Sequence, residues 1–289
     1  MPRFEYFAPK NVEEVLFLLS EYKGKAKVLA GGTDLLIRIK ERKATPAYII
    51  GLAEVPGLDF IKAGDDRGLR LGALATHQSI VDSTLFRGKY ALLATACRKI
   101  GTPQIRNMGT IGGNLCNAGP STDSAPPLLT LGTMLKLTSI SGQREVPLDE
   151  FFVAPFQTVM REDELLTEIV VPPLPRRSGG SYHWLTKITA IDETLVGVAA
   201  LVILDGSGKE IQDARIALCS VAPTPMRAKK AEEVLKGKKV TEMLIDKAAE
   251  IVGSETRPRS MADYRKRMSL VLARRTIKEA IDKARNQEG

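Results

Sequence analysis

Two glycine pairs, each set among small polar residues, mark the parts of this chain best suited to chemistry. The first glycine segment is Ala30-Gly31-Gly32-Thr33-Asp34; the second is Thr110-Ile111-Gly112-Gly113-Asn114, at the centre of residues 102–123. That longer stretch has neither a helical nor a strand hydrophobic period, so we expect a functional loop there. Because glycine lacks a Cβ, a large anion could approach the backbone amides of both segments closely. Together the two segments predict a diphosphate held between them.

Neither glycine pair is specific by itself, since turns and helix ends also use glycine for purely structural reasons. The first segment is neither the Rossmann Gly-x-Gly-x-x-Gly nor a P-loop, which ends in Lys-Ser/Thr. Asp34 would repel a diphosphate unless its carboxylate faces away and caps the following helix. For this segment alone, a tight structural turn explains the sequence as well as phosphate binding does.

The elements around the first glycine segment predict a βαβ-like unit. Asn11 followed by Glu14 resembles a capping box that opens an amphipathic helix. Strands are expected at 27–30 and 48–52, with a helix at 35–41 between them. This order places the glycine turn at a helix N-terminus, where amides and the helix dipole favour anions.

The rest of the chain indicates a second α/β region and a separate C-terminal unit. A stretch rich in proline and glycine at 172–180 is the clearest linker. After it, strands followed by helices predict a small antiparallel sheet covered by helices. The expected strands are 69–75, 133–140, 145–148, 165–171, 182–188, 196–204 and 211–220, and the expected helices are 89–100, 125–131, 227–235, 241–252 and 261–286.

Length and composition favour a globular protein of two or three domains. The chain has 289 residues, of which 44% are hydrophobic and 26% charged. No apolar run approaches the roughly 18 residues of a membrane span. The N-terminal residues lack the apolar centre of a signal peptide, so we expect a cytoplasmic protein without a membrane span.

Cysteine and histidine are too few and too scattered for a metal site. Cys97, Cys116 and Cys219 form no Cys-x-x-Cys pair, and the only histidines are His77 and His183. We expect Cys116 to be a small buried residue rather than a redox group. For His77 an exposed turn or the start of a helix is the preferred interpretation.

The net charge of +8 raises the question of an acidic partner. Much of the excess lies in residues 257–285, where a solvated helix face is the preferred interpretation. Docking of an acidic partner subunit is the next. Nucleic acid is not expected, because Tyr264 is the only aromatic residue there and no recognition motif is present.

With their flanking residues, the two glycine segments resemble the FAD-binding medium subunits of molybdenum hydroxylases. This family includes the medium subunit of carbon monoxide dehydrogenase and the FAD domain of xanthine dehydrogenase. The resemblance is carried by LAGGTDLL at 29–36 and PQIRNMGTIGGN at 103–114, with support from Asp123, ELLTEI at 164–169 and ADYRKRM at 262–268.

The resemblance implies an α+β fold in two parts. The first is a two-part FAD-binding domain of the vanillyl-alcohol-oxidase (PCMH) type, and the second is a C-terminal domain with a small antiparallel sheet covered by helices. The expected boundaries are residues 1–56 and 57–175 for the two FAD-binding subdomains and 176–289 for the C-terminal domain.

The resemblance also implies which residues contact FAD. The two glycine segments would wrap its diphosphate and ribityl chain, and Ile100 and Leu165 would flank the isoalloxazine ring. Asp123 would accept a hydrogen bond from a ring N–H or a sugar hydroxyl, and Lys187 would place positive charge beside the ring. The implied contacts are Leu29, Ala30, Gly31, Gly32, Thr33, Asp34, Leu35, Ile100, Thr110, Ile111, Gly112, Gly113, Asn114, Asp123, Leu165 and Lys187.

One departure from the family follows Lys187. The family often has an arginine-rich segment there, whereas residues 188–193 read ITAIDE in this chain. The segment is also shorter, which predicts a different outer edge of the flavin site.

The implied function is electron transfer within a larger enzyme, with no catalytic residue of its own. A large subunit would hold a molybdenum cofactor and a small subunit two [2Fe–2S] clusters, and the expected assembly is a dimer of heterotrimers. The FAD-binding subunit would pass electrons to NAD, a quinone or oxygen. Two alternatives are a stand-alone FAD-dependent oxidoreductase of the same fold, which needs its own proton donor, and a flavin-free interaction subunit.

Overall fold

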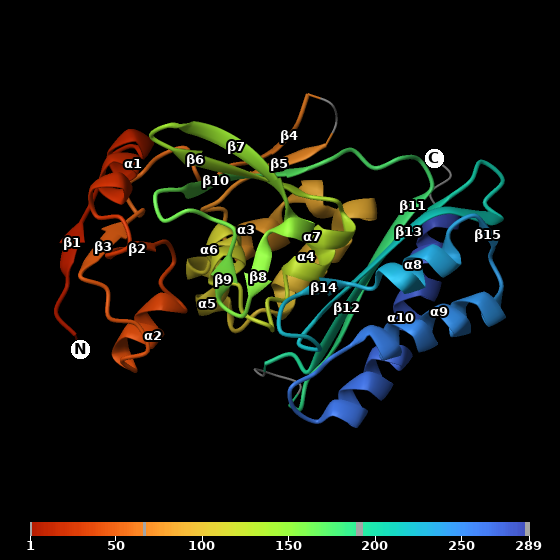
Figure 1. Ribbon diagram of the computed structural model, residues 1–289. Helices are drawn as coiled ribbons and strands as arrows, with labels where there is room; N and C mark the ends of the chain where they lie inside the picture. Colours follow the sequence, from red (N-terminus) through yellow and green to blue (C-terminus); the bar gives the residue numbers. More distant parts are fainter. Residues whose placement is uncertain (1, 66–67, 189–192, 287–289) are drawn as a thin grey trace.

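The computed structural model describes residues 2–65, 68–188 and 193–286. Three sheets, each with its own helices, follow one another from left to right in Figure 1. The fold is α+β, as predicted. Among the helices of the described ranges, none has the length and hydropathy that a membrane crossing requires.

The first sheet is a parallel βαβ unit with one added strand. Its order is β1-β3-β2, and β3 pairs in parallel with both neighbours. The helix α1 begins as predicted, because Asn11 Oδ1 accepts a 2.8 Å hydrogen bond from the Glu14 amide. The predicted sequence of strand, glycine turn, helix and strand is confirmed. The elements are β1 (Glu5–Phe7), α1 (Val12–Glu21), β2 (Ala26–Leu29), α2 (Leu35–Lys40) and β3 (Tyr48–Gly51).

The second sheet is antiparallel, with the order β4-β5-β10-β6-β7, and its helices lie below it in Figure 1. A small hairpin, β8 and β9, lies near the same helices. The strands are β4 (Ile61–Ala63), β5 (Leu69–Gly72), β6 (Met134–Ser139), β7 (Gly142–Pro147), β8 (Phe152–Ala154), β9 (Gln157–Thr158) and β10 (Leu165–Val171). The helices are α3 (His77–Asp82), α4 (Ala91–Lys99), α5 (Pro103–Met108), α6 (Ile111–Asn117) and α7 (Ala125–Thr130).

The third sheet is antiparallel and covered by the C-terminal helices, as predicted. Its long strands follow the order β11-β12-β13, and two short strands pair with β13. The elements are β11 (Ser178–Leu185), β12 (Val196–Leu204), β13 (Glu210–Cys219), β14 (Met226–Arg227), α8 (Lys229–Leu235), β15 (Lys238–Lys239), α9 (Glu242–Glu255) and α10 (Ala262–Arg285).

The central strand β12 shows how the third sheet is joined to the rest of the molecule. Every residue of β12 is buried. Val198, Ala200 and Val202 pack in the core under the C-terminal helices, while Ala199 and Leu201 pack in the core of the second sheet. The third sheet is therefore covered on both faces. The domain boundaries at residues 56 and 175 stay a prediction.

The expected loop at residues 102–123 is wrong in part, because it contains the short helices α5 and α6. A threonine starts each helix. Thr102 Oγ1 accepts a 3.3 Å hydrogen bond from the Ile105 amide, and Thr110 Oγ1 accepts one of 3.1 Å from the Gly113 amide. Tertiary contacts and caps thus stabilise helices that glycine and proline content obscures.

The expected linker at residues 172–180 is also wrong at its end. The strand β11 begins at Ser178 rather than at 182, and residues 178–180 are buried. Gly179 explains part of this, because its missing side chain lets α10 pack directly on the strand. A Cβ there would lie 2.0 Å from the Ala280 carbonyl oxygen and 2.3 Å from the Ala284 nitrogen.

We expect Gly179→Ala to lower the free energy of unfolding by about 3 kcal/mol, because a methyl group would push α10 from the sheet. Urea unfolding of wild type and variant measures the difference. Gly206→Ala is the control, since its Cβ would meet nothing within 4 Å. Equal stability of both variants would show that Gly179 does not fix this packing.

Candidate functional site

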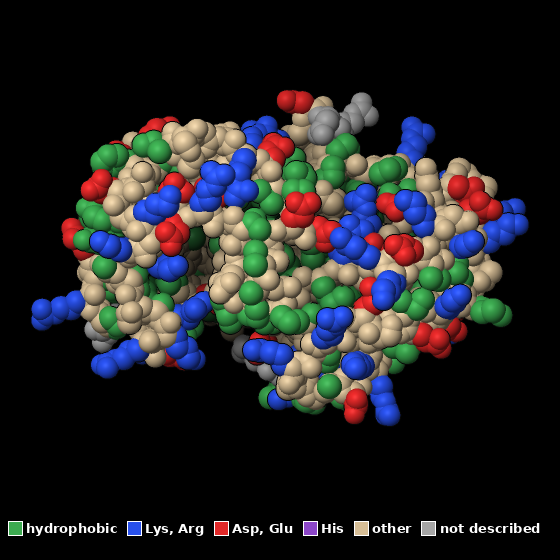
Figure 2. Space-filling model, in the orientation of Figure 1, with side chains coloured by type: hydrophobic (Ala, Val, Ile, Leu, Met, Phe, Trp, Pro, Cys, Tyr) green, Lys and Arg blue, Asp and Glu red, His purple; other side chains and the backbone are tan. Residues whose placement is uncertain are grey.

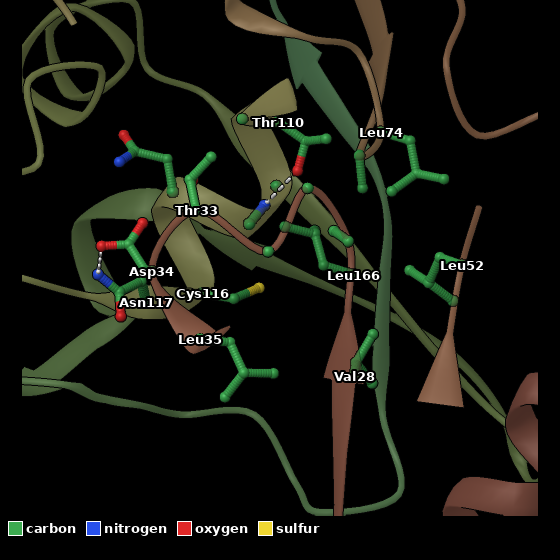
Figure 3. Close-up of a pocket in the computed structure, with 18 of the residues that line it drawn as sticks. Val28, Thr33, Asp34, Leu35, Leu52, Leu74, Thr110, Cys116, Asn117 and Leu166 are labelled. Carbon is green, nitrogen blue, oxygen red and sulfur yellow. Dashed lines mark hydrogen bonds between the residues drawn. The ribbon is translucent and has the colours of Figure 1, made fainter. Parts of the chain in front are cut away.

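A cavity of about 520 Å³ lies between the first sheet and the helices of the second sheet (Figure 3). In the space-filling view the surface is hollowed between α2 and the β8–β9 hairpin (Figure 2). Both glycine segments contribute to its walls. The predicted contacts that line it are Ala30, Gly31, Gly32, Thr33, Asp34, Leu35, Ile100, Thr110, Gly112, Gly113, Asn114 and Leu165.

The first glycine segment meets the backbone of the residues just before the second segment. A Cβ on Gly31 would lie only 1.8 Å from the Met108 carbonyl oxygen. A Cβ on Gly113 would lie 2.8 Å from Thr110 Oγ1 and 3.7 Å from the Ala30 Cβ. Any larger residue at Gly31 would force the segments apart, so glycine is required here by close approach.

The second glycine segment is fastened to the chain that follows β5. Its Ile111 amide donates to the Ala75 carbonyl at 2.9 Å, and its Gly112 amide donates to the Ala73 carbonyl at 2.9 Å. Gly112 also fits closely there, since a Cβ would lie 2.6 Å from the Ala73 oxygen. These contacts fix one wall of the cavity.

The same hydrogen bonds correct the prediction that both segments offer bare amides. In the second segment the Gly113 amide donates to Thr110 Oγ1 at 3.1 Å and the Asn114 amide to the Thr110 carbonyl at 3.0 Å. With Ile111 and Gly112 also paired, this segment has no free amide between 111 and 114. Apart from Thr110, the second segment therefore contributes a closely packed backbone surface rather than free amide donors.

The first glycine segment has the opposite character. The amides of Gly31, Gly32, Thr33 and Asp34 donate to no protein acceptor within the part of the chain that the structure describes. Gly32 holds a φ of +74°, which turns the backbone at the cavity wall. A run of unpaired amides at a cavity wall is the arrangement that binds phosphate oxygens.

Asn114 adds a side-chain donor to these amides. Its Oδ1 accepts a 2.6 Å hydrogen bond from Ser124 Oγ. This contact orients the side-chain amide and leaves Nδ2 as the group that can donate to a ligand.

Asp34 does not cap its helix, contrary to the prediction. It stands at the N-cap position of α2 in a helical conformation, without a side-chain cap. Its Oδ1 instead accepts a 3.2 Å hydrogen bond from Asn117 Nδ2, shown dashed in Figure 3. Desolvation raises the pKa of Asp34, and the charge of Arg38 opposes this shift. The hydrogen bond between Asp34 and Asn117 ties the first segment to the end of α6.

Comparison with known proteins places this geometry in a family. Family profiles match residues 2–174 as the FAD binding domain in molybdopterin dehydrogenase and residues 185–280 as the CO dehydrogenase flavoprotein C-terminal domain. The carbon monoxide dehydrogenase medium chain of Hydrogenophaga pseudoflava is 34% identical over 283 residues, which is 96% of this chain and 97% of that protein. This chain belongs to the FAD-binding medium subunits of molybdenum hydroxylases.

Two further similarities support the assignment to the medium-subunit family. The glyceraldehyde dehydrogenase medium chain of Sulfolobus acidocaldarius is 34% identical over 284 residues, covering 96% of this chain and 98% of that one. The structure of Hydrogenophaga pseudoflava carbon monoxide dehydrogenase lacking the Mo-pyranopterin moiety superimposes with a TM-score of 0.93, covering 98% of each chain. The family cofactor is FAD, and the unpaired amides of the first segment fit its diphosphate.

Four of the predicted contacts do not line the cavity of this medium subunit. Leu29 ends β2, and the Ile111 side chain is fully buried in the core of the second sheet. Lys187 is exposed just beyond β11, and residues 189–192 of the shortened segment lie outside the described residues. Asp123 lies in the interface with the third sheet.

Asp123 joins the two halves of the molecule. Its Oδ1 accepts hydrogen bonds from Tyr182 Oη at 2.8 Å and Thr194 Oγ1 at 2.7 Å. Burial raises the pKa of Asp123, while these two hydrogen bonds oppose the shift. Both hydrogen bonds go to Oδ1, which leaves Oδ2 as the oxygen that can accept a hydrogen bond from a ligand.

The sequence prediction missed the apolar wall of the cavity. Val28, Leu52, Leu74 and Leu166 line it opposite the glycine segments. Leu52 follows directly after β3 and Leu74 lies two residues after β5, so the ends of the predicted strands 48–52 and 69–75 were the available signal. Cys116 is half-buried in the cavity wall, and burial raises the pKa of its thiol to about 12. The thiol therefore stays protonated, as expected for a packing residue.

His77 is the first residue of α3, in agreement with the expected start of a helix. It is buried, however, rather than exposed. Only 2% of its surface is accessible, and its Nδ1 has no partner in the described residues. Desolvation, with a smaller effect from Arg106, lowers the pKa of His77 to about 4. His77 lines the cavity as a neutral side chain near pH 7.

The buried His77 should make stability depend on pH. Its pKa of about 4 lies below the ordinary value of 6.5, so the unfolded chain binds more protons between these values. Its contribution to folding is full above pH 6.5 and is lost as the pH falls toward 4. By pH 5 this loss is about 2 kcal/mol. We expect urea unfolding of His77→Gln to lose that much less stability than wild type between pH 7 and 5; equal losses would contradict a buried neutral His77.

Proposed function

We propose that this chain is the electron-transfer subunit of a multi-subunit molybdenum hydroxylase or dehydrogenase. It receives electrons from [2Fe–2S] clusters of a small partner subunit and passes them to an external acceptor. Bound FAD supplies the link between one-electron and two-electron transfer. The observation that carries the proposal is the cavity in which the unpaired amides at residues 31–34 face the glycine surface at 112–113.

The binding roles follow from the donors that each wall offers. The amides of Gly31 to Asp34 and Nδ2 of Asn114 hold the diphosphate.

Ile100 and Leu165 flank the isoalloxazine ring and exclude water from it. Asp123 Oδ2 accepts a hydrogen bond from a ring N–H or a sugar hydroxyl, and Lys187 brings positive charge to the ring edge. Leu29 and Ile111 support the two segments from behind.

Three of the titratable side chains that line the cavity, those of His77, Cys116 and Glu164, favour electron transfer over a stand-alone oxidoreductase. Such an enzyme needs a group that exchanges protons with its substrate near neutral pH. His77 has a pKa near 4 and Cys116 a pKa near 12, so neither does. Glu164 is ion-paired with Arg144, with Oε1 2.6 Å from Nε. Hydrogen bonds and charge from Arg144 hold the pKa of Glu164 below its usual value despite desolvation.

The partners are a large molybdenum-cofactor subunit and a small iron–sulfur subunit, in a dimer of heterotrimers. The acceptor is NAD, a quinone or oxygen. The named relatives support an assembly, since they are medium chains of carbon monoxide and glyceraldehyde dehydrogenases. This chain is equally identical, at 34%, to medium chains of two enzymes that are named for different substrates. The large subunit therefore determines which substrate is oxidised.

The basic C-terminal residues are better explained as a solvated surface than as a docking site. Lys, Arg, Asp and Glu are interspersed over α8 to α10 in Figure 2. Arg274 pairs with Asp246 at 2.6 Å, and Lys278 pairs with Glu242 at 2.6 Å. Paired charges of this kind present little net attraction to an acidic partner.

We expect purified chain reconstituted with FAD to show a flavin spectrum but no bleaching by the substrate of the holoenzyme. Bleaching should require the co-expressed large and small subunits, because the substrate is oxidised outside this chain. Anaerobic absorbance at the flavin bands measures this. Bleaching of the isolated chain by substrate would favour the stand-alone oxidoreductase, and persistent absence of flavin would favour the flavin-free subunit.

Gly113→Val should abolish FAD binding, because its side chain would project from the surface that the diphosphate approaches. Equilibrium titration with FAD, followed by flavin fluorescence, should show at least about a 100-fold loss of affinity. Gly206→Val is the control, since that position is open. Near-normal affinity in Gly113→Val would contradict the position of the second segment in the site.

A further inference from the structure

A guanidinium and an aromatic ring face each other at the cavity wall. The Cζ of Arg38 lies 4.8 Å from the centroid of the Phe156 ring, within the range of a cation–π contact. Both side chains line the cavity. They come from different parts of the fold, because Arg38 belongs to α2 and Phe156 to the turn between β8 and β9. The pair therefore bridges the two walls.

The backbone of Phe156 is held in an unfavourable conformation. Its φ is +62°, a left-handed conformation that bulky residues rarely adopt, and 49% of its surface is exposed. The Phe156 amide donates a 2.9 Å hydrogen bond to the Ala118 carbonyl at the end of α6, which fixes the turn. Strained backbone that is held in place by its surroundings is characteristic of ligand clamps.

The two ends of helix α6 define the line along which a bound cofactor would extend. It starts at Thr110, just after α5, whose Arg106 donates to the Ile100 carbonyl at 3.2 Å. It ends seven residues later beside Phe156, about 10 Å away along the helix axis. The proposed diphosphate site is at the first glycine segment, between these ends. With the isoalloxazine ring placed at Ile100, the other half of the cofactor extends toward Arg38 and Phe156.

We propose that Phe156 and Arg38 bind the adenine of FAD and make this site select the dinucleotide over FMN; this inference rests on the proposed function. Adenine stacks on aromatic faces and on guanidinium planes. At 4.8 Å the pair is too close for a ring to fit between them, because each stacking contact needs about 3.5 Å. Arg38, on a flexible stem, moves from the Phe156 face and closes over the second face of the adenine.

The test compares the two halves of the cofactor. ADP carries the adenine and diphosphate, whereas FMN carries the flavin without the adenosine. We expect Phe156→Ala to weaken FAD and ADP by the same factor, about 5- to 100-fold, and to leave FMN affinity unchanged. Phe156→Tyr should retain wild-type affinity for all three, since it keeps the aromatic face. Isothermal titration of each ligand measures the constants.

Two further variants separate a lost contact from a disturbed fold. Phe156→Gly removes the ring while suiting the left-handed backbone, so it should melt no lower than wild type and still lose ADP affinity. Phe17→Ala is the matched control, because Phe17 is 58% exposed on α1 and does not line the cavity. It should bind all three ligands normally.

The remaining results of these titrations would contradict either the adenine assignment or the proposed function. Unchanged ADP affinity in Phe156→Ala would overturn the adenine assignment, and so would selective loss of FMN, which would place the flavin at this end. Equal losses of ADP and FMN would overturn it as well, since they indicate general disturbance. Wild-type chain that binds none of the three would instead refute the proposed function itself.

Discussion

The structure depends on one close approach, that of the Gly31 backbone to the Met108 carbonyl. A single methyl group there would stand 1.8 Å from that oxygen. The contact brings the turn after β2 against the α5–α6 connection, although the two are far apart in the chain. It also encloses the cavity, because the first sheet meets the helices of the second sheet here. Glycine is therefore required at position 31, and this close approach shapes the cavity.

This contact divides the work between the two glycine segments. The second segment uses the amides of residues 111–114 to secure itself to residues 73, 75 and 110, so these amides are not available to a ligand. The first segment keeps its amides unpaired and is the source of donors. Asp34 would oppose an anion, but its carboxylate is turned to Asn117. Two similar motifs suggest a symmetric clamp, but the two walls of the site differ. The first segment provides hydrogen-bond donors, and the second provides a packed backbone surface.

Much of the fold could be predicted because it rests on local signals. The capping box at Asn11, the glycine turn after β2 and the uninterrupted apolar strand β12 all appear in the sequence. The helices α5 and α6 could not be predicted, since glycine and proline disfavour helix and the caps act only once the segment is folded. The pairing of the Gly112 amide with Ala73 was equally hidden, because it depends on tertiary position. The burial of His77 has the same cause.

On the proposed function, FAD binds through the amides of the first segment against a second segment whose amides at residues 111–114 are already hydrogen-bonded. Hydrogen–deuterium exchange with and without FAD tests it most directly. We expect strong new protection at residues 31–34 when FAD is added, and slow exchange at 111–114 that changes little. Rapid exchange at 111–114 without FAD, with protection gained there rather than at 31–34, would contradict it.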